Sequence, residues 1–262
     1  MSTSKQVALI TGASAGIGAT YADRLAKRGY ALVLVARDTQ RLQALATRLQ
    51  DETGTSIEVL PADLTRNADV VRIEQRLQTG DVTLLVNNAG MSLKGGLLEN
   101  GPAALEQIIA LNVTAPTRLA AAAAQSFVEQ GSGAIVNLSS VLAFAPEMFE
   151  GVYSGTKAYL LNLSQAMAAQ FGPRGVYVQA VLPGATRTEL WEKAGRDMDE
   201  FPPGFLMEVD VMVDAALVGF DRRETVTIPP LPDEGQFLAM QQARLAMAPN
   251  LSRSDVPARY LR

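Results

Sequence analysis

The sequence predicts an α/β fold in which one doubly wound parallel sheet of about seven strands carries helices on both faces. Short aliphatic and β-branched runs alternate with helical patterns along the chain. Several runs are apolar on both faces, which is typical of strands buried in a parallel sheet. The alternation also requires crossover connections, and these join parallel strands. The runs lie at residues 6–12, 31–37, 56–62, 82–88, 133–140, 176–184 and 225–230.

Helical patterns fill the intervals between these runs. After the second run, apolar residues recur at i, i+3, i+4 and i+7, which predicts an amphipathic helix. Asp38 or Thr39 can cap its first turn. The alanine-rich stretch at 119–127 contains no helix-breaking residue, so it predicts a tightly packed helix rather than a linker. The apolar positions of the amphipathic helix are Leu42, Leu45, Ala46 and Leu49.

Composition narrows the domain organisation and the partners. The 262 residues are 48% hydrophobic and 19% charged, and no change of composition marks a linker, so we expect a single domain over 1–262. The net charge is −4 and no Lys/Arg cluster is present, which argues against a nucleic-acid partner. No apolar run reaches the ~18 residues of a membrane span, and the N-terminus is typical of a first strand rather than a signal peptide. We therefore expect a soluble cytoplasmic protein with no membrane partner.

Two residue types that often carry catalysis are missing from this chain. The sequence contains neither cysteine nor histidine. This excludes disulfides, thiolate chemistry and Cys/His zinc sites, and we expect no metal site. A Ser-His-Asp hydrolase is excluded as well. The acid–base groups of an enzyme with this sequence must come from Tyr, Lys, Asp, Glu or a cofactor.

The first predicted strand leads directly into TGASAGIG, residues 11–18, where a helix begins. Gly12, Gly16 and Gly18 have the spacing G-x3-G-x-G. Glycine permits positive φ and lets backbone N–H groups approach a pyrophosphate, and the helix N-terminus adds partial positive charge. A glycine turn without a ligand is the alternative. The strand–turn–helix context favours a dinucleotide site.

The residues after the second predicted strand bear on the choice of cofactor. An NAD site usually places an acidic side chain there to bind the ribose 2′-hydroxyl. Here Ala36 ends the strand and Arg37 follows, and a guanidinium suits the 2′-phosphate of NADP. Asp38 would repel that phosphate, but its alternative role is to cap the next helix. We therefore expect NADP(H), with NAD(H) as the alternative.

Seven short motifs in order between residues 5 and 190 resemble those of the short-chain dehydrogenase/reductase family. They are TGASAGIG (11–18), ADL (62–64), NNAG (87–90), LNV around Asn112, NLSS (137–140), YSGTK (153–157) and PGATRT (183–188). The resemblance implies a Rossmann fold and an oxidoreductase that transfers a hydride between NADP(H) and a carbonyl compound or secondary alcohol. The alternative function is a dinucleotide-binding sensor or partner protein without turnover.

The resemblance also implies the cofactor-binding residues. Asp63 would bind the adenine edge, and Asn87 would lie against the cofactor. Structural alternatives stay open, because Asp63 can start a turn, Asn87 and Asn88 can hydrogen-bond a loop and Thr188 can cap a helix. The full set is Gly12, Ser14, Gly16, Ile17, Gly18, Arg37, Asp63, Leu64, Asn87, Ala89, Gly90, Tyr153, Lys157, Pro183, Gly184 and Thr188.

The catalytic set that the resemblance implies is Ser140, Tyr153, Lys157 and Asn112. The family's serine precedes its tyrosine by thirteen positions, which selects Ser140 over Ser139. Tyr153 and Lys157 are four residues apart and therefore share a helix face. Tyrosine has an ordinary pKa near 10, and an ammonium group one turn away favours the phenolate. Tyr153 would exchange a proton with the substrate oxygen, and Asn112 would either hold a water or bend its own helix.

The substrate is expected to lie under a lid formed by residues 187–222. Apolar and aromatic residues in and near this segment favour a medium-sized apolar ketone, aldehyde or secondary alcohol. Arg187 and Lys94 leave a hydroxy- or keto-acid open as an alternative. The apolar residues are Met91, Leu93, Leu142, Phe144, Met148, Trp191, Phe201, Phe205, Leu206 and Met207.

The C-terminal segment departs from the family pattern. Residues 231–262 read as an additional helix and a tail, where many family members have a glycine-rich strand. This favours a homodimer over the tetramer that is common in the family. The helices predicted at 101–130 and 151–171 are rich in small residues, and we expect them at the subunit interface.

Overall fold

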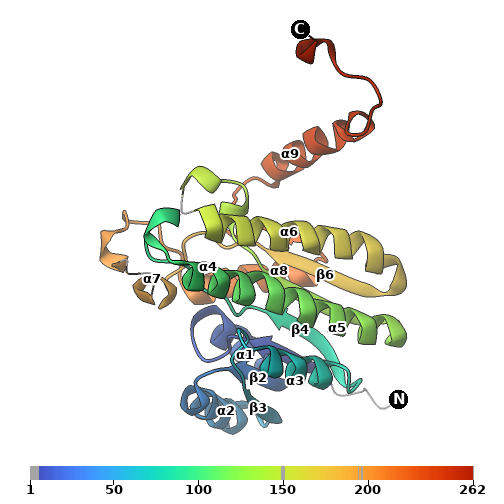
Figure 1. Ribbon diagram of the computed structural model, residues 1–262. Helices are drawn as coiled ribbons and strands as arrows, with labels where there is room; N and C mark the ends of the chain where they lie inside the picture. Colours follow the sequence, from blue (N-terminus) through green and yellow to red (C-terminus); the bar gives the residue numbers. More distant parts are fainter. Residues whose placement is uncertain (1–5, 149–150, 194, 196, 262) are drawn as a thin grey trace. The chain divides into compact units, whose positions relative to one another are not determined.

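The computed structural model describes residues 6–148, 151–193, 195 and 197–261. Residues 194 and 196 of the predicted lid and Arg262 of the predicted tail lie outside the described residues. The chain divides into two compact units, Met1–Pro229 and Pro230–Arg262, and each is considered by itself. Figure 1 shows the first unit as a sheet with helices packed on it.

A seven-stranded parallel sheet forms the centre of the first unit, in the order β3-β2-β1-β4-β5-β6-β7. The predicted doubly wound sheet is thereby confirmed, and each predicted run contains one strand. The winding reverses between β1 and β4, and sheets of this type bind ligands beyond the carboxyl ends of such strands. The strands are β1 (Val7–Thr11), β2 (Ala31–Ala36), β3 (Ile57–Pro61), β4 (Val82–Asn87), β5 (Gly133–Leu138), β6 (Val176–Val181) and β7 (Val226–Thr227).

Helices cover both faces of the sheet. Residues of α1, α2 and α8 pack in one hydrophobic layer, and residues of α3, α5 and α6 pack in the other. Figure 1 shows α5 and α6 lying across one face. The helices are α1 (Gly16–Lys27), α2 (Thr39–Thr53), α3 (Asn67–Leu77), α4 (Pro102–Ile109), a π-helical turn (Ala110–Thr114), α5 (Ala115–Gln130), α6 (Gly151–Phe171), α7 (Leu190–Lys193) and α8 (Val209–Asp221). Short 3-10 turns lie at Leu97–Glu99, Val141–Ala143, Pro146–Met148, Gly172–Arg174 and Met198–Glu200.

The strand sequences explain why both faces are buried. Successive side chains of a strand point to opposite faces. In β1, Ala8 and Ile10 join the layer that contains α1, while Val7 and Leu9 join the layer that contains α5. Because the central strands are apolar in both directions, their carboxyl ends are held between two packed layers.

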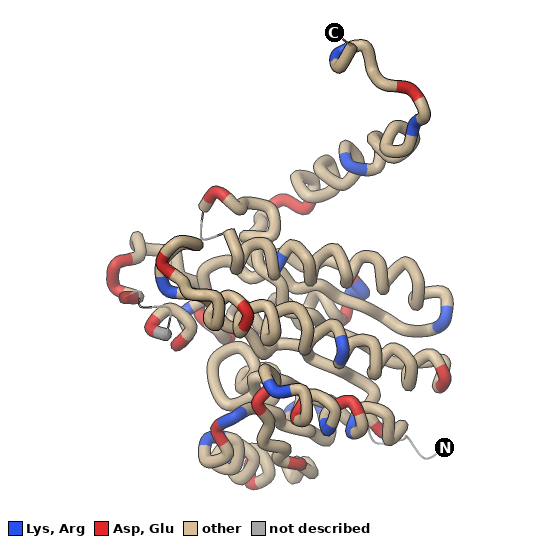
Figure 2. The backbone as a smooth tube through the Cα atoms, in the orientation of Figure 1, with Lys and Arg blue, Asp and Glu red and all other residues tan. Residues whose placement is uncertain are grey.

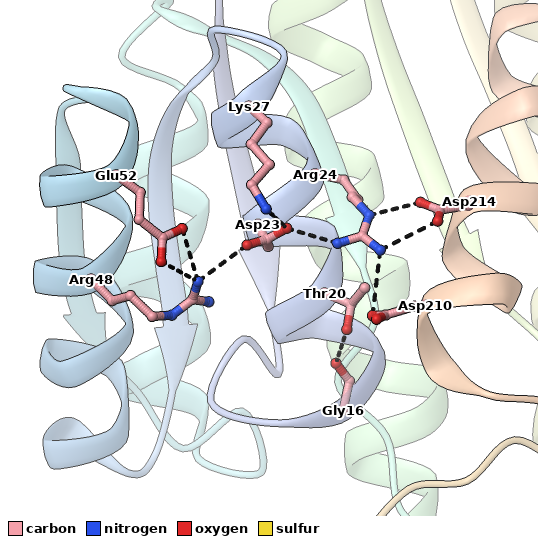
Figure 3. Close-up of polar contacts among 9 residues, drawn as sticks. All are labelled: Gly16, Thr20, Asp23, Arg24, Lys27, Arg48, Glu52, Asp210 and Asp214. Carbon is pink, nitrogen blue, oxygen red and sulfur yellow. Dashed lines mark hydrogen bonds and ion pairs between the residues drawn. The ribbon is translucent and has the colours of Figure 1, made fainter.

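A network of ion pairs around one buried carboxylate links three of the helices on one face (Figure 3). Asp23 of α1 accepts hydrogen bonds from Arg24 (2.8 Å), Lys27 (2.9 Å) and Arg48 of α2 (3.2 Å). Arg24 also donates to Asp214 of α8 at 2.7 Å. Burial acts to raise the pKa of Asp23, but the hydrogen bonds from these cations outweigh burial and lower it. The network therefore fixes α1 against α2 and α8 by a carboxylate that stays ionised.

Charge is unevenly distributed over the first unit. Figure 2 shows many charged residues on α1, α2 and α3, whereas α5 and α6 are almost free of them. Among the described residues, no helix combines the length and the apolar character that crossing a membrane requires.

The second unit contains the helix that was predicted beyond the last strand. Helix α9 (Glu234–Ala246) begins at Asp233, whose side chain accepts a hydrogen bond from the N–H of Gly235 at 2.8 Å. Two 3-10 turns follow, at Ala248–Asn250 and Ala258–Tyr260. None of the residues of α9 is buried.

Candidate active site

A cavity of about 800 Å³ opens beyond the carboxyl ends of the central strands. The strand order places a ligand site at this edge of the sheet. The predicted positions that form its walls are Gly12, Ser14, Gly16, Ile17, Arg37, Asp63, Leu64, Ala89, Gly90, Ser140, Tyr153, Lys157, Pro183, Gly184 and Thr188. The structure therefore brings together residues that are up to 176 positions apart in the sequence. Gly18, Asn87 and Asn112 lie next to the walls but do not form them.

The glycine turn after β1 is packed too closely for larger side chains. Gly12 has φ of +67°, and a Cβ atom there would lie 2.7 Å from the side-chain nitrogen of Asn88. A Cβ at Gly18 would lie only 2.3 Å from the carbonyl oxygen of Gly12. Gly12 thus permits the turn, and Gly18 lets α1 start directly behind it. The backbone at this wall stays uncovered by side chains, which is what a close approach by a pyrophosphate requires.

Asn88 braces the glycine turn, which agrees with the alternative in which it hydrogen-bonds a loop. Its side-chain nitrogen donates to the carbonyl oxygens of Thr11 (2.9 Å) and Gly12 (3.3 Å). The hydroxyl of Thr11 accepts from the backbone N–H groups of Asn88 and Ala89, both at 3.0 Å. These bonds join the ends of β1 and β4, and Asn88 itself forms part of the cavity wall.

Asn87 lies behind the wall and is 3% exposed. Its side-chain nitrogen donates to Asn137 of β5 (3.0 Å) and to the carbonyl oxygen of Pro116 (3.2 Å). Asn137 in turn donates to Ser164 of α6 at 2.9 Å. Asn87 therefore connects β4 with β5 and α5, and the partners of its side-chain nitrogen are not in a loop.

Two arginines, Arg37 and Arg41, stand among the wall residues at the end of β2. Asp38 caps α2, since its carboxylate accepts from the backbone N–H of Arg41 at 2.9 Å. The expected capping role of Asp38 is therefore confirmed. Asp63, beyond β3, accepts from the N–H and the hydroxyl of Thr65 at 3.0 and 2.7 Å, so it also starts a turn.

Tyr153 and Lys157 occupy one face of α6, one turn apart, and both form the wall. The Nζ atom of Lys157 lies 5.6 Å from the centre of the Tyr153 ring. Ser140 also forms the wall, and its Oγ atom accepts from the N–H of Leu142 at 3.2 Å. The Oγ atom of Ser139 instead donates to the carbonyl oxygen of Lys157 at 2.7 Å, so its proton is committed to the backbone.

Burial changes the acid–base character of Lys157. The side chain is 6% exposed, and its Nζ atom donates to the carbonyl oxygen of Leu138 at 2.8 Å. Burial lowers the pKa of Lys157 from 10.5 to about 8. The ammonium form is still the major one at pH 7, but its proton is released far more easily than that of an exposed lysine.

Asn112 lies in the π-helical turn between α4 and α5 and is buried. Its amide forms two bonds with the backbone of Met91, accepting from the N–H (2.9 Å) and donating to the carbonyl oxygen (2.8 Å). It also donates to Thr156 of α6 at 3.1 Å. A Cβ at Gly90 would lie 3.4 Å from Asn112 Oδ1 and 3.5 Å from Lys157 Nζ, so both polar atoms border the same small space. Turns of this kind are frequent at functional sites.

Aromatic side chains form the outer wall of the cavity. Trp191 packs edge-on against Phe201 with ring centres 4.9 Å apart, and Phe201 stacks on Phe205 at 5.6 Å. The indole N–H of Trp191 donates to the carbonyl oxygen of Thr186 at 2.8 Å. Met91, Leu142 and Met148 are further apolar wall residues. Leu93, Phe144, Leu206, Met207, Arg187 and Lys94 are not among the wall residues that the described structure provides.

These features fit a dinucleotide. The cavity wall contains a bare glycine turn, two arginines and a tyrosine–lysine pair. The glycine turn suits a pyrophosphate, and the arginines suit a phosphate on the adenosine ribose. Lys157 and Tyr153 are the groups that would hold the nicotinamide riboside near the reacting atoms.

The family model of the short chain dehydrogenases matches residues 6–199. The chain belongs to this family. The resemblance carried by the seven motifs is therefore confirmed, and the protein is an oxidoreductase of the short-chain dehydrogenase type.

Solved structures extend the similarity of this short-chain dehydrogenase to the rest of the chain. A short-chain dehydrogenase from Sphingobium yanoikuyae, in complex with NADPH, is 52% identical with a TM-score of 0.95, and the match covers 98% of this chain and 100% of that one. The bulky-bulky ketone specific alcohol dehydrogenase from Comamonas testosteroni is 46% identical with a TM-score of 0.92, over 99% and 100% of the two chains.

Two curated relatives each match about seven tenths of this short-chain dehydrogenase. The human 17-beta-hydroxysteroid dehydrogenase type 3 is 32% identical over 187 residues, which are 71% of this chain and 60% of the human protein. An uncharacterized oxidoreductase from Staphylococcus saprophyticus is 33% identical over 71% of this chain and 80% of its own length.

Proposed function

We propose that this short-chain dehydrogenase is an NADP-dependent carbonyl reductase or alcohol dehydrogenase that acts on apolar ketones and aldehydes of medium size. The observation that carries the proposal is the meeting of Ser140, Tyr153 and Lys157 at one wall of a cavity that has a bare glycine turn on one side and aromatic side chains on the other. The first side suits a dinucleotide, and the second suits an apolar substrate.

NADP(H) is the cofactor that the end of β2 suits best. Arg37 and Arg41 supply two guanidinium groups to the cavity wall there. The residue after Arg37 is Asp38, and its carboxylate caps α2. The similarity to a dehydrogenase solved with NADPH supports the same choice.

The residues around the reacting atoms suit proton transfer to a carbonyl oxygen. A bound nicotinamide supplies or accepts the hydride. The Ser140 hydroxyl accepts from the N–H of Leu142, and a hydroxyl can donate its proton to a substrate oxygen at the same time. Tyr153 then delivers the proton to the substrate oxygen on which negative charge develops.

Lys157 makes Tyr153 competent for this step. Its ammonium lies 5.6 Å from the centre of the Tyr153 ring and both side chains are buried, so it favours the phenolate that remains after the proton has left. With a pKa lowered to about 8 by burial, Lys157 can also lose a proton and regain one from solvent. Asn112, whose Oδ1 atom borders the same space at Gly90, is the group that would hold a water for this exchange.

The apolar wall favours a substrate with bulky groups on both sides of the carbonyl. Trp191, Phe201 and Phe205 form one continuous aromatic surface in the wall. Neither Lys94 nor Arg187 forms the wall, and Arg187 pairs with Glu208 at 3.0 Å, so the site offers less to an acid group. The similarity to a bulky-bulky ketone specific alcohol dehydrogenase supports this substrate class.

The test is NADPH oxidation with a panel of ketones and aldehydes, for the wild type and for Tyr153→Phe. We expect turnover by the wild type and a fall of kcat by about 10²–10⁴-fold in the variant, with NADPH affinity retained. The matched control is Tyr159→Phe, because Tyr159 is also on α6 but is 40% exposed and bonds Thr117 instead of facing the cavity. Wild-type turnover by Tyr153→Phe would refute the proton-transfer role. NADPH binding without turnover on any compound would favour a cofactor sensor.

We also propose that the protein is a homodimer, formed through α5 and α6. The scarcity of charged residues on these two helices supports this (Figure 2). Light scattering after size-exclusion chromatography gives the mass directly. A mass near twice the 27.9 kDa of the chain is expected, and a mass near four times that value would favour a tetramer.

A further inference from the structure

An ion pair crosses the wall of the cavity at its adenosine end. Arg41, in the first turn of α2, donates from Nη1 to both carboxylate oxygens of Glu189, at 2.8 and 2.9 Å. Its Nε atom lies 3.6 Å from the carboxylate of Asp38. All three residues form the wall together with Arg37. The guanidinium of Arg41 therefore faces two carboxylates at the place where a ribose phosphate would bind.

The pair joins two parts of the site that are remote in the sequence. Arg41 belongs to the helix that follows β2, whereas Glu189 directly precedes α7 at the start of the lid. The other end of the lid is anchored elsewhere. Figure 3 shows Arg24 of α1 bonded to Asp214 (2.7 Å) and paired with Asp210 (3.5 Å) at the start of α8. Arg24 is not a wall residue, so a ligand in the cavity can reach the pair at Glu189 but not the one at Arg24.

The Arg41–Glu189 pair is weak enough to be exchanged. The side chains are 51% and 39% exposed, and ion pairs with this exposure contribute little because water solvates both partners. A phosphate monoester carries up to two charges, and a guanidinium can bind it through two parallel hydrogen bonds. The carboxylate of Glu189 would also repel a phosphate placed beside Arg41.

We propose that Arg41 and Glu189 set the selectivity between NADP(H) and NAD(H). Arg41 binds the 2′-phosphate together with Arg37, and that phosphate displaces Glu189 from Arg41. Glu189 therefore weakens the binding of cofactors that carry the 2′-phosphate and does not affect the others. When NADP(H) binds, Glu189 leaves Arg41, and this frees the first residues of the lid. The inference rests on the proposed use of NADP(H) by this site.

The experiment measures dissociation constants by titration calorimetry for NADPH, NADH and 2′,5′-ADP, a probe with the phosphate but without nicotinamide. The proteins are the wild type, Arg41→Met, Glu189→Gln and the control Glu52→Gln. Glu52 pairs in the same way with an exposed arginine of α2, Arg48 at 3.0 Å, but neither residue forms the cavity wall.

Arg41→Met is expected to weaken the binding of NADPH and 2′,5′-ADP by about 10-fold and to leave NADH binding within about 2-fold. Glu189→Gln is expected to tighten the first two by about 2- to 5-fold and to leave NADH unchanged, since a neutral amide no longer competes for Arg41. Glu52→Gln should change none of the three constants.

The proposal is overturned if Glu189→Gln weakens NADPH binding or leaves it unchanged, or if Arg41→Met affects NADPH and NADH equally. These results differ from a failure of the proposed function. If the wild-type protein binds and oxidises NADPH but the two variants give one of these overturning results, only the exchange at Arg41 is wrong. If the wild type binds no nicotinamide cofactor, both proposals are wrong.

Discussion

The cofactor end and the lid end of the cavity are held by different kinds of contact. At the cofactor end, the backbone of the glycine turn is bonded to Asn88 and closed behind by α1, with a Cβ at Gly18 only 2.3 Å from a carbonyl oxygen. At the lid end, aromatic rings lie against one another, and Phe205 is 50% exposed. The first region is held by closely packed backbone, whereas a ring of the second is half open to water.

The base of the lid is fastened by few backbone bonds. The N–H of Arg187 donates to Met207 and the N–H of Met207 donates to Ala185, both at 2.9 Å. Between these points, the backbone bonds of the described residues are local, such as that from Phe205 to Pro202 (3.1 Å), and the indole of Trp191 bonds Thr186. A region with few buried contacts can change shape at low cost, whereas a turn between packed strands cannot. The reaction geometry is thus set by the rigid end, and we expect substrate selection to be set by the other.

The largest expected effect concerns the buried charge at the rigid end. The pKa of Lys157 is about 8 in the folded protein and 10.5 without burial. Between these values the unfolded chain binds more protons, so the unfolding free energy of the wild type rises with pH there. Below pH 8 Lys157 is protonated in both the folded and the unfolded protein, so the full destabilisation by its buried ammonium is present there.

We expect the difference in unfolding free energy between the wild type and Lys157→Met to rise by up to about 3 kcal/mol from pH 7 to pH 10.5. Urea titrations at several pH values measure it. Lys94→Met, at an exposed position outside the cavity wall, is the control and should give a flat difference. A flat difference for Lys157→Met would mean that water reaches the ammonium group of Lys157 in the wild type and that the cofactor end of the cavity is not rigid.

Gly18→Ala should break the cofactor end. The added methyl group would meet the backbone of Gly12, which the bonds to Asn88 prevent from moving. Overpacking of this kind costs about 1–3 kcal/mol, so we expect NADPH affinity to fall by about 10- to 100-fold. Fluorescence titration of NADPH measures this. Unchanged affinity would show that the turn can yield.

Phe205→Ala should affect the lid end alone. The substitution removes an exposed ring that stacks on Phe201 in the cavity wall. We expect kcat/KM for a bulky ketone to fall by about 10-fold, while NADPH affinity stays within about 2-fold. Steady-state kinetics with a bulky ketone and with acetone show whether the loss of kcat/KM is confined to the bulky substrate. An equal loss for both substrates would contradict the role of this ring in selection.

Gly155→Ala is expected to give the smallest effect and is the counterpart of Gly18→Ala. Gly155 lies in α6 between Tyr153 and Lys157, and a Cβ there would meet no atom within 4 Å. The change should raise the unfolding free energy by about 0.5–1 kcal/mol, because alanine favours the helix. Thermal denaturation measures it, and reduced NADPH binding would reveal a close approach at Gly155 that the structure does not show.

The sequence by itself determined the parts of the protein that depend on neighbouring residues. The short aliphatic and β-branched runs predicted all seven strands, because burial on both faces leaves a pattern in each strand separately. The spacing of Tyr153 and Lys157 placed them on one helix face for the same reason. The cofactor-binding and catalytic residues were predicted from short motifs, each of which occupies a few consecutive residues of a turn, a strand end or a helix.

The tertiary structure decided which of two adjacent asparagines reaches the cavity wall. Successive residues at a strand end point to opposite faces, and Asn88 forms the wall where the motif NNAG had led us to expect Asn87 against the cofactor. Ser139 and Ser140 both form the wall, but only the hydroxyl proton of Ser139 is committed to the backbone of Lys157. The pair Arg41–Glu189 had no sequence signal at all, because its partners are 148 positions apart and meet only after the sheet has formed.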